Sequence, residues 1–155
     1  AQKLTTVLTE KQIHLLLQKC SELDFELKEH VFMSVRLGCR PGELRFLKWS
    51  NIDFENKLIY IKGSTTRSGL EKSTKTGEDR VLPMTKSMEL FLRKLRFKTG
   101  GISFVLPQVK AWVKHEQSRE FKKFLNLISM IHQIEMKILK ELELENYYSL
   151  LKKKV

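Results

Sequence analysis

Apolar residues recur at helical spacing near the start of the chain. Four of them fall on one face of a helix with 3.6 residues per turn: Ile13, Leu16, Leu17 and Cys20. The residues just before this stripe have the form of a capping box, with Thr9 as the N-cap and Gln12 reaching back to it. The spacing therefore predicts a first helix over residues 10–22.

Two more helices are expected before residue 50. Residues 27–37 place apolar side chains on one face, and Gly38 is a natural stop, because glycine readily adopts the left-handed conformation that ends helices. Pro41 suits the first position of the next helix, since its missing N–H would have no partner there. We expect that helix to bury three residues on one side: Leu44, Leu47 and Trp49.

The period then changes to that of β-strands. Residues 57–62 are rich in β-branched and aromatic residues, and residues 80–84 predict a partner strand. Between them lies a long polar stretch, residues 63–79, with three glycines as turn signals. This part of the chain therefore predicts a hairpin or small antiparallel sheet.

Helical spacing returns in the second half of the chain. Thr85 can cap a helix that runs to about residue 98 and ends at the Gly100–Gly101 pair. Residues 104–107 form a short extended piece, and two further helices are expected near residues 108–129 and 131–152. The pattern predicts an α+β fold that is mostly α-helical, with helices around one small antiparallel β-sheet or hairpin.

Composition narrows the class of protein. The chain has 155 residues, 41% hydrophobic and 30% charged, which suits a single compact domain over residues 1–155. Its net charge of +11 favours a polyanionic partner, of which nucleic acid is the commonest, although an acidic membrane or protein remains open. No apolar run is long enough to span a membrane, and the first residues hold no signal core, so the expected location is the cytoplasm. Cys20 and Cys39 are too few for a disulfide framework or a zinc site, so we expect reduced, structural thiols.

Arg40 is the first candidate for chemistry. It stands just before a predicted helix start, where backbone N–H groups favour anions, and its guanidinium could hold two phosphate oxygens. Glu43 lies three residues further on, within reach to brace this arginine. The alternative is an ordinary surface ion pair, which contributes little to stability.

The residue order around Arg40 resembles the box of the first catalytic arginine in tyrosine recombinases and integrases. Residues 38–53 are GCRPGELRFLKWSNID, and the family pattern is a small-residue turn, Arg, Glu-Leu, a second Leu, Trp and a final Ile-Asp. Residues 74–84, TKTGEDRVLPM, resemble the family's β-hairpin, whose turn carries the catalytic lysine. Lys75 is the matching lysine. Lys62 competes for the role but lacks the apolar-Pro strand that should follow.

The resemblance, clear over residues 37–84, implies a catalytic domain for site-specific DNA strand breakage and rejoining. A tyrosine hydroxyl attacks the phosphodiester, forms a 3′-phosphotyrosyl link and releases a 5′-hydroxyl. Arg40 would stabilise charge on the phosphate oxygens, and Lys75 would protonate the leaving oxygen. Since the phosphotyrosyl link conserves the bond energy, no metal or nucleotide cofactor is expected. The implied partner is double-stranded DNA, with three further contacting residues: Arg67, Lys72 and Arg80.

The family's second box is not recognisable after about residue 128. That box is His-x-x-Arg, followed by a further His or Trp and then the tyrosine. His132 is near the expected place, but Glu135 stands where the family has arginine. Tyr148 is the candidate nucleophile, but it follows His132 too closely to leave room for the helices that separate the two in the family. Two hypotheses therefore stay open: a recombinase catalytic domain or fragment, and a non-catalytic DNA-binding remnant with the same fold.

A third hypothesis concerns the C-terminal segment. Residues 131–151 are amphipathic and could pack on a second copy on DNA, as recombinases pass a C-terminal helix between protomers. The more usual role of such a stripe is to close the core of its own domain. The resemblance also implies a bacterial, archaeal or phage-encoded protein of a mobile element. In the family, a helical domain that clamps the far side of the DNA precedes the catalytic domain. We expect this chain to lack that domain.

Overall fold

The computed structural model describes residues 8–62 and 79–153. The chain packs into two compact units, Ala1–Lys114 and His115–Val155. Nearly all of the layered structure belongs to the first unit, so we describe this unit first and by itself.

The first unit opens with two helices that follow the sequence pattern closely. At the start of α1 (Glu10–Glu22), the Thr9 hydroxyl accepts from the Gln12 N–H at 3.2 Å, and the Gln12 side chain accepts from the Thr9 N–H at 2.8 Å. α2 (Lys28–Leu37) ends at Gly38, whose φ of 61° is left-handed. The predicted capping box and the predicted glycine stop are both confirmed.

The third helix is shorter than its apolar residues suggested. α3 (Pro41–Arg45) begins at Pro41 as predicted, but it ends before Leu47 and Trp49, the latter of which starts the 3₁₀ turn η1 (Trp49–Asn51). The prediction that both residues lie on the buried side of this helix is therefore wrong, although both side chains are buried. Their backbone pairs instead with a later extended segment, because the Trp49 N–H donates to the Ser103 carbonyl and the Val105 N–H donates to the Leu47 carbonyl, each at 2.9 Å.

A three-stranded antiparallel sheet follows, in the order β1 (Ile52–Asp53), β2 (Leu58–Ile61) and β3 (Arg80–Pro83). Ile59 faces Leu82, and Ile61 faces Arg80, across β2 and β3. The predicted pair of strands and the predicted α+β class are confirmed. β1 was not predicted, because two residues are too few to display a strand period.

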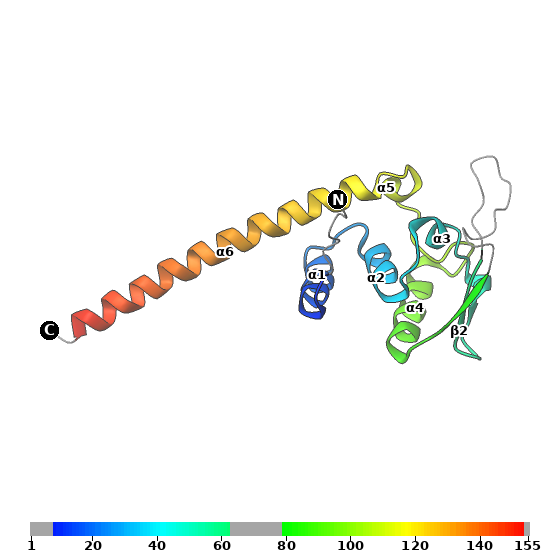
Figure 1. The fold of residues 1–155 in the computed structure, drawn as a ribbon, viewed down its shortest axis with the longest axis horizontal. Coiled ribbons are helices and arrows are strands. Elements are labelled where there is room, and N and C mark those ends of the chain that lie inside the picture. The colour runs from blue at the N-terminus through cyan, green and yellow to red at the C-terminus, as the bar shows by residue number, and fades with distance from the viewer. Residues whose placement is uncertain (1–7, 63–78, 154–155) are drawn as a thin grey trace, which may run out of the picture. The chain divides into compact units, whose positions relative to one another are not determined.

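Helices cover one face of this sheet (Figure 1). α4 (Lys86–Thr99) starts at its predicted cap, where the Thr85 hydroxyl accepts from the Met88 N–H at 3.2 Å. Its buried residues join those of β2 in one core, which contains Ile59, Ile61, Met88, Leu92 and Leu95. An ion pair of 2.6 Å between Lys98 and the buried Glu29 ties α4 to α2.

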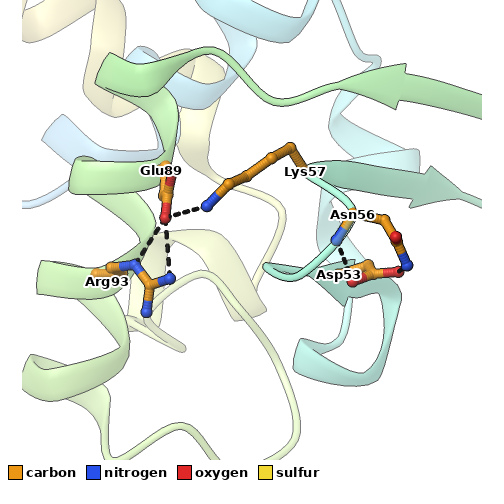
Figure 2. Close-up of polar contacts among 5 residues, drawn as sticks. All are labelled: Asp53, Asn56, Lys57, Glu89 and Arg93. Atoms are coloured by element: carbon orange, nitrogen blue, oxygen red, sulfur yellow. Dashed lines mark hydrogen bonds and ion pairs between the residues drawn. The ribbon is translucent and has the colours of Figure 1, made fainter.

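The turn between β1 and β2 is fixed by polar contacts that also reach α4 (Figure 2). Asp53 accepts from both the backbone and the side-chain N–H of Asn56, at 2.9 and 2.8 Å. Lys57, in the left-handed conformation, reaches across to Glu89 at 2.5 Å, and Arg93 holds the same carboxylate oxygen at 2.9 and 3.0 Å. Lys57 first, and Arg93 second, lower the pKa of Glu89, so this carboxylate stays charged and anchors the turn.

The second unit is dominated by one long helix. α5 (Lys110–Val113) is short and ends the first unit, and α6 (Gln117–Lys153) then continues for 37 residues. The prediction of two helices near residues 108–129 and 131–152 is therefore wrong. Residues 117–153 contain neither glycine nor proline, so nothing in the chain stops the helix near residue 130. Within the described residues, no helix combines the length and the apolar character required to cross a membrane.

Candidate functional site

Arg40 lies at the surface, at the point where the chain turns into α3. It is the N-cap residue, with extended backbone angles of −70° and 150°, and its side chain is exposed. Cys39, which directly precedes it, and the α3 residue Leu44, four positions after it, are buried in the core. The backbone of Arg40 is therefore anchored while its guanidinium remains available to a ligand.

Glu43 connects the two sequence boxes that resemble the recombinase family. One of its carboxylate oxygens accepts from the Arg40 N–H at 2.8 Å and from the Arg80 guanidinium at 2.9 Å. Glu43 is 9% exposed, whereas the Arg80 side chain is 43% exposed. The structure thus brings Arg40, Glu43 and Arg80 together, and Glu43 supports Arg40 through its backbone while it orients Arg80 directly.

Cys39 takes part in the same contact. Its sulfur accepts a hydrogen bond of 3.4 Å from the Arg80 guanidinium. Burial raises the pKa of the Cys39 thiol, while Arg80 acts in the opposite direction, so the thiol stays protonated at neutral pH. Both cysteines of the chain are free and buried, and among the described residues no group of three or more His, Cys, Asp or Glu side chains could hold a metal ion.

A second cluster of side chains, made of Arg45, Trp112 and His30, packs against α3 on its buried side. The buried Arg45 donates to the Trp112 carbonyl, and its guanidinium lies 4.3 Å from the centre of the indole ring. The ring of His30 lies 4.5 Å from that of Trp112, and its Nε2 donates to the Pro107 carbonyl at 2.9 Å. Apolar periodicity cannot indicate such a cluster, because two of its three members are polar and they come from three distant segments.

His30 is held neutral in this cluster. Burial, with a smaller contribution from the nearby Arg45, lowers its pKa to about 4, against the opposing effects of the Pro107 carbonyl and Glu29. Its Nδ1 is buried and has no hydrogen-bond partner in the described part of the chain. A neutral imidazole therefore packs under the helix that carries the candidate site.

Three predicted residues, Arg67, Lys72 and Lys75, lie outside the described residues. The strand ends on either side of them are described. Ile61 pairs with Arg80 across the sheet, and Arg80 contacts Glu43, so both strand ends lie beside the Arg40 helix. Lys62, the competing lysine, is exposed directly after β2.

The remaining two candidates belong to α6. His132 is exposed, and Glu135 follows it by almost one helical turn on the same side of the helix. Tyr148 lies within α6, and its side chain is outside the described ones. Both residues belong to the second unit, whereas Glu43 and its partners belong to the first.

Known proteins resemble this chain in sequence pattern and in fold. The model of the phage integrase family matches residues 6–135. No curated protein matches the chain. Two solved structures of the Tn1549 transposon integrase are similar. The one in complex with a circular intermediate DNA has a TM-score of 0.51 at 20% identity, over 61% of this chain and 33% of that one. The one in complex with transposon right end DNA has a TM-score of 0.58 at 18% identity, over 69% of this chain and 39% of that one.

These likenesses differ in what they establish. At 18 and 20% identity the structural matches show the fold alone, and the chain corresponds to well under half of each integrase chain. The family match is broader, because it includes the Arg40 box, both main strands and the start of α6. Since it extends over most of the sequence, this chain belongs to the phage integrase family of tyrosine recombinases.

Proposed function

We propose that this chain is the catalytic-domain part of a site-specific recombinase of a phage or mobile element, and that it binds double-stranded DNA for strand breakage and rejoining. The observation that carries the proposal is the contact of Glu43 with both Arg40 and Arg80. Two boxes about 40 positions apart in sequence meet at one carboxylate, as a shared phosphate-binding site requires.

The charges around Glu43 suit a phosphate. Glu43 is occupied by a backbone N–H and a guanidinium, so its negative charge is balanced locally and does not oppose an approaching anion. Arg40 would hold the non-bridging oxygens, the 43% exposed side chain of Arg80 would add a further DNA contact, and Lys75 would protonate the leaving 5′ oxygen. The net charge of +11 would favour the approach of DNA as a whole.

A second candidate function is DNA binding without strand breakage. The observation that favours it is the course of α6, which is one helix through the region where the family has its second box. Glu135 takes the position of the second arginine, and a carboxylate there repels phosphate. Because nucleophile and phosphate clamp act as a unit, loss of one member removes most of the rate.

DNA as partner and assembly on DNA are further parts of the proposal. The Tn1549 integrase structures contain DNA, which supports a DNA partner for a chain of the same fold. Assembly of copies through the C-terminal helix agrees with the exposed apolar residues of α6, among them Ile134 and Ile138.

One experiment separates the two candidates. The chain is titrated against duplex DNA over a series of salt concentrations, and then incubated with a nicked duplex and run on a denaturing gel. The recombinase proposal expects affinity that falls steeply with salt, together with a covalent adduct that Tyr148→Phe removes and Tyr147→Phe keeps. Salt-sensitive binding with no adduct supports the second candidate. Affinity that is insensitive to salt contradicts both.

A further inference from the structure

α6 carries an apolar stripe that the described structure leaves largely open to solvent. Its members recur at intervals of three and four residues, and so share one side of the helix: Leu127, Met130, Ile131, Ile134 and Ile138. Leu127 is 42% exposed, Met130 and Ile134 are each 54% exposed, and Ile138 is 50% exposed. A contiguous apolar surface of this kind normally marks an interaction site, because soluble proteins rarely leave one in water.

The charges along α6 are distributed unevenly about the middle of this stripe. Residues 117–130 contain three basic residues and one acidic residue, whereas residues 131–145 contain two basic and four acidic ones. The basic half includes Lys122 and Lys123, and the acidic half includes Glu135 and Glu141. A partner that matches this helix must therefore be acidic beside its first half and basic beside its second half.

We infer that the partner is α6 of a second copy of this chain, paired in the antiparallel direction. Antiparallel pairing about a two-fold axis near residues 132 and 133 places Leu127 opposite Ile138 of the second copy. It also places each basic half beside an acidic half. The inference deepens the assembly part of the proposed function and rests on it, but the pairing itself involves no DNA.

Parallel pairing of the same helices is disfavoured by the same charges. In a parallel pair, each half of the helix would lie beside the same half of the second copy. Glu135 and Glu141 would then approach other carboxylates, and the two lysines Lys122 and Lys123 would approach other lysines. A two-fold antiparallel arrangement also closes on itself, because each copy offers the same stripe to the other. Assembly through this stripe therefore stops at two copies.

The first test measures the mass of the full chain without DNA by sedimentation equilibrium. The concentration series reaches about 0.5 mM, because interfaces smaller than about 1,200 Å² associate weakly. We expect a monomer–dimer equilibrium, whose dissociation constant rises about tenfold or more in Ile134→Gln. The matched control is Met136→Gln, which changes an exposed apolar residue of the same helix on the opposite side and should leave the equilibrium unchanged.

The outcomes of this test are distinct. Circular dichroism must report equal helicity for both variants. Equal helicity shows that a weaker dimer does not result from unfolding of α6. A wild-type chain that stays monomeric throughout the series overturns the inference, as does an equal effect of the two substitutions. If the chain is a monomer that binds DNA, the pairing is wrong and the proposed function stands. If the chain is a dimer with no affinity for DNA, the proposed function is wrong and the pairing stands.

The second test reads the direction of pairing through disulfide formation. Leu127→Cys and Ile138→Cys are made separately, on a background in which both native cysteines are buried. In an antiparallel pair the two positions face each other, while copies of the same position lie about 16 Å apart along the axis, beyond the reach of a disulfide. A mixture of the two variants should therefore cross-link, and neither variant should cross-link alone. Self-cross-linking of either single variant means a parallel pair and overturns the inference.

Discussion

Arg40 and His132 both occupy positions that the resemblance to recombinases singles out, but their surroundings differ. The backbone of Arg40 is anchored by Glu43, which is 9% exposed and also holds Arg80 of the sheet. His132 is exposed on α6, between apolar neighbours such as Ile134 that are about half exposed.

The difference lies in what fixes each position. At Arg40, residues from α3, β3 and the core determine the geometry together, so a change at one of them affects the others. On α6, the described fold is maintained mainly by hydrogen bonds between a residue and the fourth one before it, and these form with almost any side chain. The first region should therefore respond strongly to substitution and the second weakly.

The largest effect is expected for Trp112→Ala. Trp112 is 2% exposed and packs against Arg45 and His30, so its truncation leaves a cavity and should lower the free energy of unfolding by about 4 kcal/mol. The matched change in α6, Met136→Ala, should stay within about 0.5 kcal/mol of the wild type. Urea unfolding measures both. Equal losses would mean that α6 is packed as tightly as the core.

A pH change should weaken the first region through His30. Its pKa is about 4 in the folded chain and 6.5 when unfolded, so the unfolded state takes up the proton first as the pH falls. Stability is then full above about pH 7 and declines toward pH 4, by about 2 kcal/mol between pH 7 and 5. Urea unfolding at several pH values measures the slope.

The control for this prediction is His30→Gln. Glutamine does not titrate and can still donate to the Pro107 carbonyl, so its unfolding free energy should lack this slope over the same interval. Carboxylates contribute mainly at lower pH. A slope that survives in the variant would show that another group is responsible.

Arg40→Ala should reduce affinity for duplex DNA by about tenfold, or about 1.4 kcal/mol, which is typical of one lost hydrogen bond to a charged group. The side chain is exposed, so thermal stability should change little. His132→Ala, on the other helix, should leave the affinity within about twofold, since its neighbour Glu135 disfavours phosphate. Fluorescence anisotropy at a fixed salt concentration compares the two. Equal losses would remove the distinction between the sites.

The smallest effect is expected for Glu43→Gln. The amide keeps the shape but not the charge that holds Arg80, and solvent around the 43% exposed Arg80 side chain limits the cost to about 1 kcal/mol. Glu135→Gln on α6 should cost less than Glu43→Gln, because Glu135 is exposed and water screens its charge. Urea unfolding compares the two, and a larger loss for Glu135→Gln than for Glu43→Gln would reverse the expected order of the two regions.

Much of the first unit could be predicted from local signals. The caps Thr9 and Thr85, the stop at Gly38 and the start at Pro41 each depend on a few neighbouring residues, and all four appear in the structure. The strand pair was equally local, since β-branched and aromatic residues cluster in it. These features are encoded within about four residues, which is why pattern alone indicates them.

Other features of the fold could not be predicted in this way. The end of α3 depends on a longer contact, the pairing of Leu47 with Val105, and the spacing of apolar residues did not show the division between α5 and α6. The spacing of apolar residues does not show where a helix ends and an extended segment begins, because buried positions are apolar in both conformations.

By itself, the sequence determined the α+β class and the family, since residues 38–53 carry the Arg40 box in contiguous form. Only the tertiary structure decided that Glu43 joins Arg40 to Arg80, that Arg45 lies buried on Trp112, and that α6 runs unbroken past His132. The physical reason is range. Caps and turns depend on neighbours in the chain, whereas a shared carboxylate or a stacked guanidinium depends on segments that meet only when the core closes.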